Sequence, residues 1–165
     1  MEKELKALGY IKAMTSYGGD EYPKYMKYYT TENENAYVEW LKEQPKISGK
    51  ILYRGYTFDE MYFSDGCYEV DSVINVDNLT QDTAPSFTTD FIRACLYINE
   101  YGEIALEDRV RVLFVIHTKG KYFVDISKYS AYPEEKEYKC CNDLKLRIKS
   151  IKRKGGYTEM CLIED

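Results

Sequence analysis

The first forty-odd residues carry apolar side chains at roughly helical spacing. Between Lys3 and Met14 the apolar positions include Leu5, Leu8, Ile11 and Ala13. Side chains three or four residues apart lie on one face of an α-helix, and Gly18-Gly19 then interrupts the pattern. The sequence therefore predicts an N-terminal helix with one buried face.

A second helix is predicted between Thr31 and Pro45. Thr31 followed by Glu34 matches a capping box, in which each side chain accepts the backbone N–H of the other residue. The apolar face of this segment consists of Ala36, Tyr37, Trp40 and Leu41. Because Pro45 and Gly49 interrupt helical structure, we expect residues 1–48 to form a helical N-terminal part.

Beyond Gly49 the apolar positions tend to alternate with polar ones, which is the period of a half-buried β-strand. The segment after Arg109 is an example, with one apolar face made of Val110, Val112, Phe114 and Ile116. Strands are expected over residues 50–55, 86–89, 110–116, 122–126, 135–140, 144–151 and 157–163. A helix is expected from Asp90, its N-cap, to about Tyr101. The predicted fold class is α+β, with N-terminal helices followed by a mixed β-sandwich core.

The length of 165 residues corresponds to a single domain, 1–165, of which residues 49–165 form the β-rich part. Charged residues make up 31% of the chain, and no apolar run approaches the ~20 residues of a membrane span. The first residues lack the apolar region of a signal peptide, so we expect a cytoplasmic protein without a membrane partner. The formal net charge of −5 argues against a protein that wraps around nucleic acid.

Cysteine and histidine usage restricts the chemistry further. Five cysteines without a Cys-x-x-Cys pair are not typical of a disulfide framework or a zinc site, so no metal is expected. Cys140 and Cys141 are neighbours and would point to opposite faces of a strand. With His117 as the only histidine, most histidine-dependent catalysis is excluded.

Two carboxylates stand two residues apart in Glu135-Lys136-Glu137. On an extended strand such residues point to the same face, so Glu135 and Glu137 would lie side by side. Adjacent carboxylates repel each other unless a cationic ligand or transition state lies between them. The pair is therefore a candidate site for chemistry that develops positive charge.

Three short motifs follow one another, each in a predicted strand. They are Leu52-Tyr53-Arg54-Gly55, Ser86-Phe87-Thr88-Thr89 and Glu135-Lys136-Glu137. None is specific by itself, but their order and strand context resemble the arginine–serine–glutamate class of toxin-like ADP-ribosyltransferases. The resemblance extends from about Tyr28 to Ile163. It departs from the family pattern in the second motif, where Phe87 and Thr88 stand in place of the commoner threonine and serine.

The resemblance implies NAD as co-substrate and gives each motif a role. Arg54 would bind the phosphates of NAD, and the backbone of Gly55 would lie near the nicotinamide amide. Glu137 would stabilise the positive charge that develops on the ribose as nicotinamide leaves. Ser86 would hold Glu137 by a hydrogen bond, while Thr88 would support the strand or the ligand.

In this family a glutamate at the position of Glu135 accompanies arginine acceptors, so an arginine of an unidentified target protein is the first expectation. The loop 127–134 corresponds to the segment that meets the target, and Tyr129 and Tyr132 are its candidate contacts. Tyr132 could stack on a guanidinium or simply pack within the fold. Two further arginines, Arg93 and Arg109, could bind phosphate or form solvated ion pairs.

Three functions remain open from the sequence. The first is transfer of ADP-ribose from NAD to a protein, and the second is hydrolysis of NAD with water in place of the acceptor. The third is a catalytically silent interaction module on the same scaffold. Glu135 and the loop before it favour transfer, while the filled catalytic positions argue against the silent module.

Overall fold

The computed structural model describes residues 1–81, 85–99 and 108–165. Its N-terminal part is helical, as predicted. The helices there are α1 (Glu2–Ser16), α2 (Tyr22–Tyr25), the 3-10 helix η1 (Met26–Tyr28) and α3 (Thr31–Glu43). The two long helices pack against each other, and Ile11 and Trp40 belong to the hydrophobic cluster between them.

The start of α3 differs from the sequence prediction by one residue. Thr30 has an extended backbone, with φ −128° and ψ 158°, and its side chain accepts the N–H of Asn33 at 3.2 Å. Thr30 is therefore the N-cap and Thr31 is already helical, so the predicted capping box of Thr31 and Glu34 is wrong. Either threonine could cap a helix, and the backbone conformation of Thr30 decides between them.

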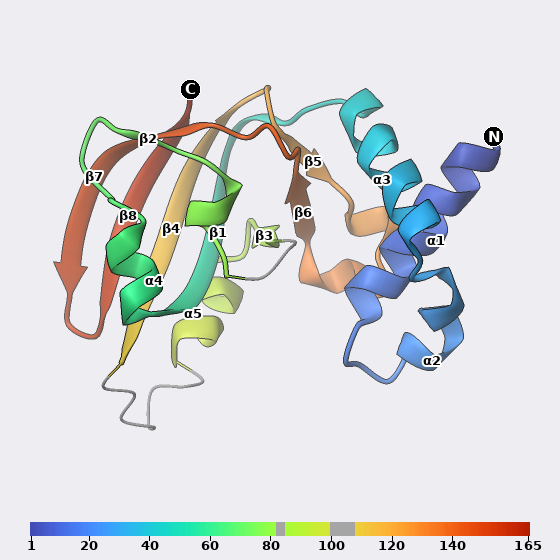
Figure 1. Cartoon of the computed structure of the whole chain (residues 1–165), viewed down its shortest axis with the longest axis horizontal. Helices are drawn as coiled ribbons and strands as arrows, with labels where there is room; N and C mark the ends of the chain where they lie inside the picture. The colour runs from blue at the N-terminus through green and yellow to red at the C-terminus, as the bar shows by residue number, and fades with distance from the viewer. Residues whose placement is uncertain (82–84, 100–107) are drawn as a thin grey trace.

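Eight strands of the described chain form one curled, mixed sheet, which confirms the α+β prediction (Figure 1). They are β1 (Ser48–Asp59), β2 (Val73–Ile74), β3 (Phe87–Thr88), β4 (Arg109–Lys119), β5 (Phe123–Asp125), β6 (Glu137–Cys140), β7 (Leu146–Lys154) and β8 (Tyr157–Glu164). Their order across the sheet is β2-β7-β8-β4-β1-β3-β6-β5. β4 and β8 run parallel, and the other strand pairs described are antiparallel.

Short helices connect these strands. They are α4 (Glu60–Asp65), α5 (Phe91–Asn99) and the 3-10 helices η2 (Val76–Asn78), η3 (Ser127–Tyr129) and η4 (Pro133–Glu135). Asp90 caps α5 as predicted, because its Oδ1 accepts the N–H of Arg93 at 3.2 Å. The predicted end of this helix near Tyr101 lies outside the described residues.

The alternating segments do form strands, with bounds that differ by a few residues from the prediction. The sequence pattern ends the first strand at Gly55, whereas β1 stays paired with β4 as far as Asp59. β3 comprises two residues only, so Ser86 precedes the strand. β6 begins at Glu137 and not at Glu135.

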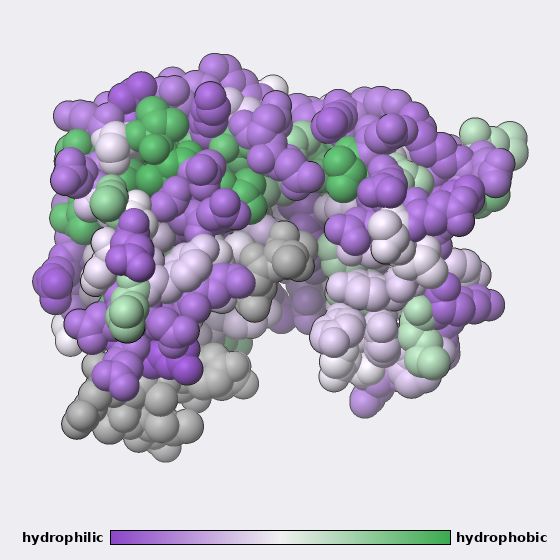
Figure 2. Space-filling view, viewed as in Figure 1, coloured by the Kyte–Doolittle hydropathy of each residue, from purple (hydrophilic) through white to green (hydrophobic). Residues whose placement is uncertain are grey.

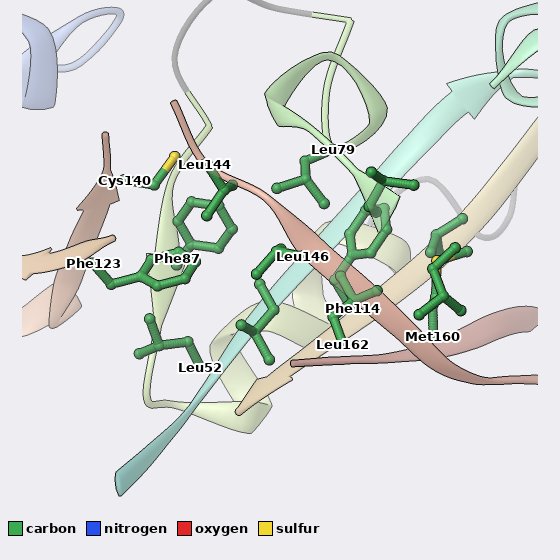
Figure 3. Packing of buried hydrophobic residues seen from close by; sticks show 14 of the residues in the cluster. Leu52, Leu79, Phe87, Phe114, Phe123, Cys140, Leu144, Leu146, Met160 and Leu162 are labelled. Carbon is green, nitrogen blue, oxygen red and sulfur yellow. The ribbon is translucent and has the colours of Figure 1, made fainter. Parts of the chain in front are cut away.

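The curl of the sheet lets its two ends share one hydrophobic core. Phe87 and Phe123, from the β3–β6–β5 end, belong to the same buried cluster as Leu146 of β7 (Figure 3). A second cluster joins the N-terminal helices to the edge strand β5 through Val124. α5 covers the opposite face of the sheet, where Ala94 packs against β4.

Figure 1 places the helical part at one end of the molecule and the large β-sheet at the other, with β3, β6 and β5 between them. The space-filling view shows the surface hollowed between these two parts (Figure 2). The second and third motifs therefore lie at the junction. Within the described ranges, the helices lack the length and apolar character needed to cross a bilayer.

Candidate active site

Arg54 lies in the middle of β1 and reaches toward the second motif. Its Nε donates to the carbonyl of Leu79 at 2.9 Å, and its Nη1 donates to the carbonyl of Ser86 at 3.2 Å. The guanidinium also lies over the Tyr56 ring, with Cζ 4.5 Å from the ring centroid. Arg54 thus binds the backbone at two points of the segment between β2 and β3.

Position 55 has no space for a side chain, because α5 lies against β1 at this point. A Cβ atom at this position would come within 2.0 Å of the carbonyl oxygen of Ala94, far inside van der Waals contact. The glycine therefore allows α5 to approach β1 closely, which brings Arg93 to the same region as Arg54. This packing requirement accounts for Gly55 before any ligand is considered.

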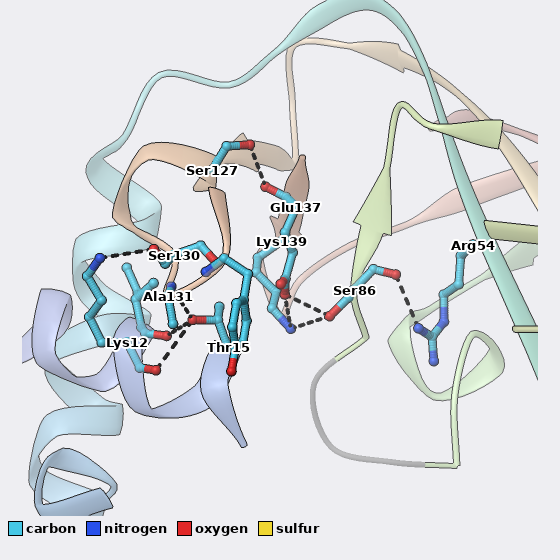
Figure 4. A network of polar contacts seen from close by, with 11 residues as sticks. Lys12, Thr15, Arg54, Ser86, Ser127, Ser130, Ala131, Glu137 and Lys139 are labelled. Carbon is cyan, nitrogen blue, oxygen red and sulfur yellow. Dashed lines mark hydrogen bonds and ion pairs between the residues drawn. The ribbon is translucent and has the colours of Figure 1, made fainter. Parts of the chain in front are cut away.

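Ser86, Glu137 and Lys139 form one polar cluster, in which Glu137 and Lys139 are buried and Ser86 is half-buried (Figure 4). Ser86 Oγ donates to Glu137 Oε2 at 2.8 Å, and Lys139 Nζ donates to Ser86 Oγ at 2.8 Å and lies 3.2 Å from Glu137 Oε2. Glu137 is 8% exposed and Lys139 is 4% exposed. Residues 137 and 139 share one face of β6, because Tyr138 and Cys140 alternate with them and point into the core.

Ser86 joins the first and third motifs. Its carbonyl accepts from Arg54 and its hydroxyl donates to Glu137, so residues far apart in the sequence become neighbours. The hydrogen bond expected between Ser86 and Glu137 is therefore present. Sequence reasoning does not single out Lys139. The sequence offers one indication, its position two residues after Glu137. A lysine at such a position is expected to be solvated unless its burial is known.

Thr88 ties β3 to its surroundings. Its hydroxyl donates to the carbonyl of Glu135 at 3.2 Å and accepts the N–H of Asp90 at 3.0 Å. The side chain is buried, at 7% exposure. Both contacts are to backbone, so Thr88 positions the start of α5 and the turn that precedes β6.

Glu135 is not on a strand, and the prediction that it stands beside Glu137 on one strand face is wrong. Glu135 is the last residue of η4, and Lys136 adopts the left-handed conformation, with φ 51° and ψ 52°, before β6 begins. Pro133 restricts φ and cannot donate to a strand ladder, which favours a helical turn over an extended run. The two-residue spacing therefore does not align the two carboxylates.

The two arginines left open by the sequence have different environments. Arg109 forms an exposed ion pair with Asp59 at the end of β1. Arg93, near the start of α5, faces Glu135 instead, with 3.8 Å between Nη1 and Oε1. Arg93 Nε is buried and has no hydrogen-bond partner among the described residues.

The Arg93–Glu135 pair is looser than the buried cluster, since both side chains are about one third exposed, at 34% and 35%. Burial raises the pKa of the Glu135 carboxyl, and the positive charge of Arg93 opposes that rise. The negative charges of Glu137 and Glu134 raise this pKa further. Glu135 and Glu137 therefore interact through space although they do not share a strand.

Tyr97 lies one turn after Arg93 on α5 and shares the electrostatic environment of the site. Burial raises the pKa of its hydroxyl, and the charges of Glu135 and Glu137 raise it further. The cations Arg93 and Arg54 oppose this rise. Sequence reasoning does not single out Tyr97, and its spacing of four residues from Arg93 on a predicted helix is the signal that was available.

The loop before β6 is attached to α1 (Figure 4). Lys12 Nζ donates to the carbonyl of Ser130 at 2.9 Å, and the N–H of Ala131 donates to Thr15 Oγ1 at 2.9 Å. The N-terminal helices thus support the turn that leads into Glu137.

Tyr129 and Tyr132 take part in the same attachment. Tyr129 packs edge-on against Trp40, with 5.3 Å between ring centroids, and the Tyr132 hydroxyl accepts the N–H of Glu21 at 3.3 Å. Both side chains are half-buried. Packing within the fold therefore occurs for both, and contact with a target stays a prediction.

Comparison of the sequence with protein-family models and with curated proteins gives no match. Comparison of the structure with solved structures does. The Vis toxin, an ADP-ribosyltransferase from Vibrio splendidus, is 18% identical with a TM-score of 0.58, over 100% of this chain and 68% of that one. Exoenzyme S from Pseudomonas aeruginosa is 17% identical with a TM-score of 0.57, over 99% and 74%. C3stau2 from S. aureus is 12% identical with a TM-score of 0.58, over 98% and 87%.

At identities of 12 to 18%, this likeness establishes the architecture of the chain. It covers nearly all residues, so the helical N-terminal part belongs to the likeness as well as the sheet. The resemblance drawn from three short motifs is confirmed at this level. The protein has the fold of the toxin-like ADP-ribosyltransferases.

Proposed function

We propose that this protein is an NAD-dependent mono-ADP-ribosyltransferase that modifies a side chain of a protein target. The observation that carries the proposal is the continuous contact from Arg54 through Ser86 to Glu137, which joins the three motifs in one place. Two of the similar structures contain NAD or carba-NAD, which supports NAD as co-substrate. A silent interaction module would not account for the buried charge of Glu137, since burial of a charge costs stability.

The residues present fit a dinucleotide with two phosphates and a ribose. Arg54 supplies a planar guanidinium suited to phosphate oxygens. Ser86 and Lys139 both contact Oε2 of Glu137, whereas Oε1 forms no hydrogen bond or ion pair with another described residue. We assign the phosphates to Arg54 and a hydroxyl of the nicotinamide ribose to Oε1. Gly55 remains the candidate contact of the nicotinamide amide.

Glu137 would act on the bond between the ribose carbon C1 and the nicotinamide nitrogen. When this bond breaks, nicotinamide leaves with the electron pair and positive charge develops on the ribose. A carboxylate that is already in place stabilises this charge without reorganisation. Ser86 keeps the carboxylate in place, and Thr88 supports the turn beside it. The acceptor nitrogen then bonds to C1 and releases a proton.

Arginine is the proposed acceptor, with Glu135 as the group that orients its guanidinium and takes its proton. Glu135 is partly exposed, and burial raises the pKa of its carboxyl, which suits a general base better than the value of an ordinary glutamate. The Vis toxin has been solved in complex with agmatine, a small guanidinium compound. Tyr129 and Tyr132, in the loop before Glu135, would meet the target protein.

Hydrolysis of NAD is the second candidate, and Arg93 is the observation that favours it. Its guanidinium already faces Glu135 at 3.8 Å. An incoming arginine must therefore compete with an internal arginine for the same carboxylate. If the ion pair between Arg93 and Glu135 persists, a substrate guanidinium cannot bind Glu135, and water can react with the ribose instead.

The test is incubation of the purified protein with NAD labelled in the adenosine part, with cell lysate in one arm and agmatine in another. Transfer predicts release of nicotinamide together with labelled protein or labelled agmatine. Nicotinamide release without a labelled acceptor would support hydrolysis, and no release at all would overturn both candidates. Mass spectrometry of the labelled protein then identifies the target and the modified residue.

A further inference from the structure

Lys139 is a buried charge for which the proposed mechanism has no role. It is 4% exposed, and its ammonium group contacts Ser86 at 2.8 Å and Glu137 at 3.2 Å. Burial of a charge is costly unless the charge is paired and hydrogen-bonded, as it is here. An uncharged side chain of the same length would fill the space, so the charge itself calls for an explanation.

The chemistry of the three groups sets the direction of their hydrogen bonds. An ammonium only donates, a carboxylate only accepts, and a hydroxyl does both. Because Ser86 Oγ accepts from Lys139, its own hydrogen is directed to Glu137 Oε2, 2.8 Å away. Lys139 therefore disfavours the rotamers in which the hydroxyl of Ser86 turns away from the carboxylate.

The contacts to Glu137 are also one-sided. Ser86 and Lys139 both reach Oε2, and no described residue forms a hydrogen bond or ion pair with Oε1. Two donors on one oxygen restrict the rotation of the carboxylate and leave the other oxygen for a ligand. The arrangement sets which oxygen of Glu137 would meet the ribose.

The strand keeps this arrangement in register. β6 lies between β3 and β5, with Glu137 paired to Thr88 and Lys139 paired to Val124. Groups built on paired strands hold their positions better than groups on loops. Lys139 and Glu137 therefore keep a constant relation to each other.

We propose that Lys139 is a positioning residue of the ADP-ribosyl transfer site, which orients the Ser86 hydroxyl toward the Glu137 carboxylate for catalysis. The inference rests on the proposed function and deepens it. Loss of positioning and loss of the positive charge at residue 139 predict opposite changes in the reaction rate. A cation beside Glu137 partly cancels the negative field that stabilises the developing positive charge, so loss of this cancellation by itself predicts a faster reaction without Lys139. Positioning predicts a slower one.

The experiment is a double-mutant cycle on nicotinamide release from NAD, with Lys139→Met, Ser86→Ala and the double variant. Lys139→Met should lower kcat about tenfold, less than the 10² to 10³ typical of removing a group that meets the developing charge itself. KM for NAD should change little. If Lys139 acts through Ser86, the double variant should be no slower than Ser86→Ala alone. The matched control is Lys149→Met, an exposed lysine on β7 that should behave as wild type.

An unchanged or faster kcat for Lys139→Met would overturn the proposal, and so would independent losses that multiply in the double variant. Thermal unfolding establishes that each variant is folded at the assay temperature. If Lys139→Met is not, Lys139→Gln, which keeps a donor without the charge, goes through the same cycle, and the same non-additivity is expected. Failure of the wild type itself to release nicotinamide would count against the proposed function instead, so the two failures are distinguishable.

Discussion

Glu137 and Glu135 are two residues apart in the sequence and differ in most physical respects. Glu137 is buried on an interior strand and is contacted by Ser86 at 2.8 Å and by Lys139 at 3.2 Å. Glu135 ends a 3-10 turn, is about one third exposed and faces Arg93 at 3.8 Å. The carboxylate proposed to act on NAD is therefore fixed, whereas the carboxylate proposed to meet the acceptor is adjustable.

The two proposed steps, cleavage of NAD and binding of the acceptor, need different properties of a carboxylate. Cleavage of one defined bond needs the same geometry in every turnover, which preorganised and buried groups provide. An acceptor on another protein needs access, and a partly exposed ion pair of less than about 1 kcal/mol can be exchanged for a new partner. The comparison predicts that changes at Glu137 affect every activity and that changes at Glu135 affect transfer alone.

The largest effect is expected from Glu137→Gln. The amide keeps the shape of the side chain but not its charge, so nicotinamide release should fall by about 10² to 10³. The ion pair between residue 137 and Lys139 would be lost, and the melting temperature should fall as well. Turnover is therefore measured well below the melting temperature of the variant. Near-wild-type turnover by the folded variant would remove Glu137 from the mechanism.

A matched control for this change is Glu164→Gln. Glu164 is equally buried, at 3% exposure, but it accepts the backbone N–H groups of Lys119 and Lys121 far along the chain from the site. Its loss should lower stability without a comparable loss of turnover per folded molecule. Equal losses of turnover in both variants would mean that the effect of Glu137→Gln reflects general destabilisation.

Glu135→Gln should separate the two activities. An amide cannot take the proton of a guanidinium, so transfer to agmatine should fall by roughly 10², the lower range for loss of a general base. Hydrolysis of NAD should largely persist, because Glu137 is untouched. The assay compares agmatine labelling with nicotinamide release. Glu134→Gln is the neighbouring control, which removes a nearby charge but keeps the proposed base, so both activities should stay close to wild type. If transfer and hydrolysis fall together, Glu135 serves NAD and the arginine assignment loses its main support.

Arg54→Lys changes the part of the site that is held rigidly, to which Ser86 and Glu137 also belong. An ammonium cannot reproduce the planar fork of a guanidinium, so NAD should bind about tenfold more weakly in calorimetric titration. The control is Arg147→Lys, since Arg147 is paired with Asp165 at the other end of the sheet. Unchanged affinity in Arg54→Lys would restrict Arg54 to its structural contacts with Leu79 and Ser86.

The pH dependence of transfer should differ from that of hydrolysis. Because burial raises the pKa of Glu135, its carboxyl stays protonated to a higher pH than that of an ordinary glutamate. Transfer needs the ionised form, so the ratio of transfer to hydrolysis should rise as pH increases through the raised pKa and then level off. In Glu135→Gln the ratio should not vary over this range. A wild-type ratio independent of pH would exclude Glu135 as the base.

The smallest effect is expected at Lys136, the left-handed residue that separates the two carboxylates. Lys136→Gly relieves the strain of a side chain in this conformation but adds freedom to the unfolded chain, so stability should change by less than about 1 kcal/mol. Lys136→Val should destabilise the protein more, because a β-branched residue tolerates this conformation poorly. Denaturant unfolding measures both, and equal stability of the valine variant would show that the turn is not required.

The sequence alone determined the kinds of element and the identity of the three motifs. Period-two alternation marks β4 and helical spacing marks α1, because both patterns depend on residues close together in the chain. The order of Arg54, Ser86 and Glu137 identified the fold, although no single motif is specific. The cap at Thr30 and the extension of β1 beyond Gly55 were missed, since the backbone of Thr30 and the pairing with β4 decided them.

The tertiary structure alone decided which polar groups meet. The sequence alone suggests that Lys139 is solvated, whereas in the structure β3 and β5 flank its strand and the N-terminal helices pack against β5. Arg93 meets Glu135 in a structure in which Gly55 lets α5 approach β1 closely. Glu135 lies in a 3-10 turn and not in the predicted strand, because Pro133 and the left-handed Lys136 favour a turn at this point. Burial, and with it the strength and direction of an electrostatic contact, depends on segments distant in the sequence, so no local pattern could supply it.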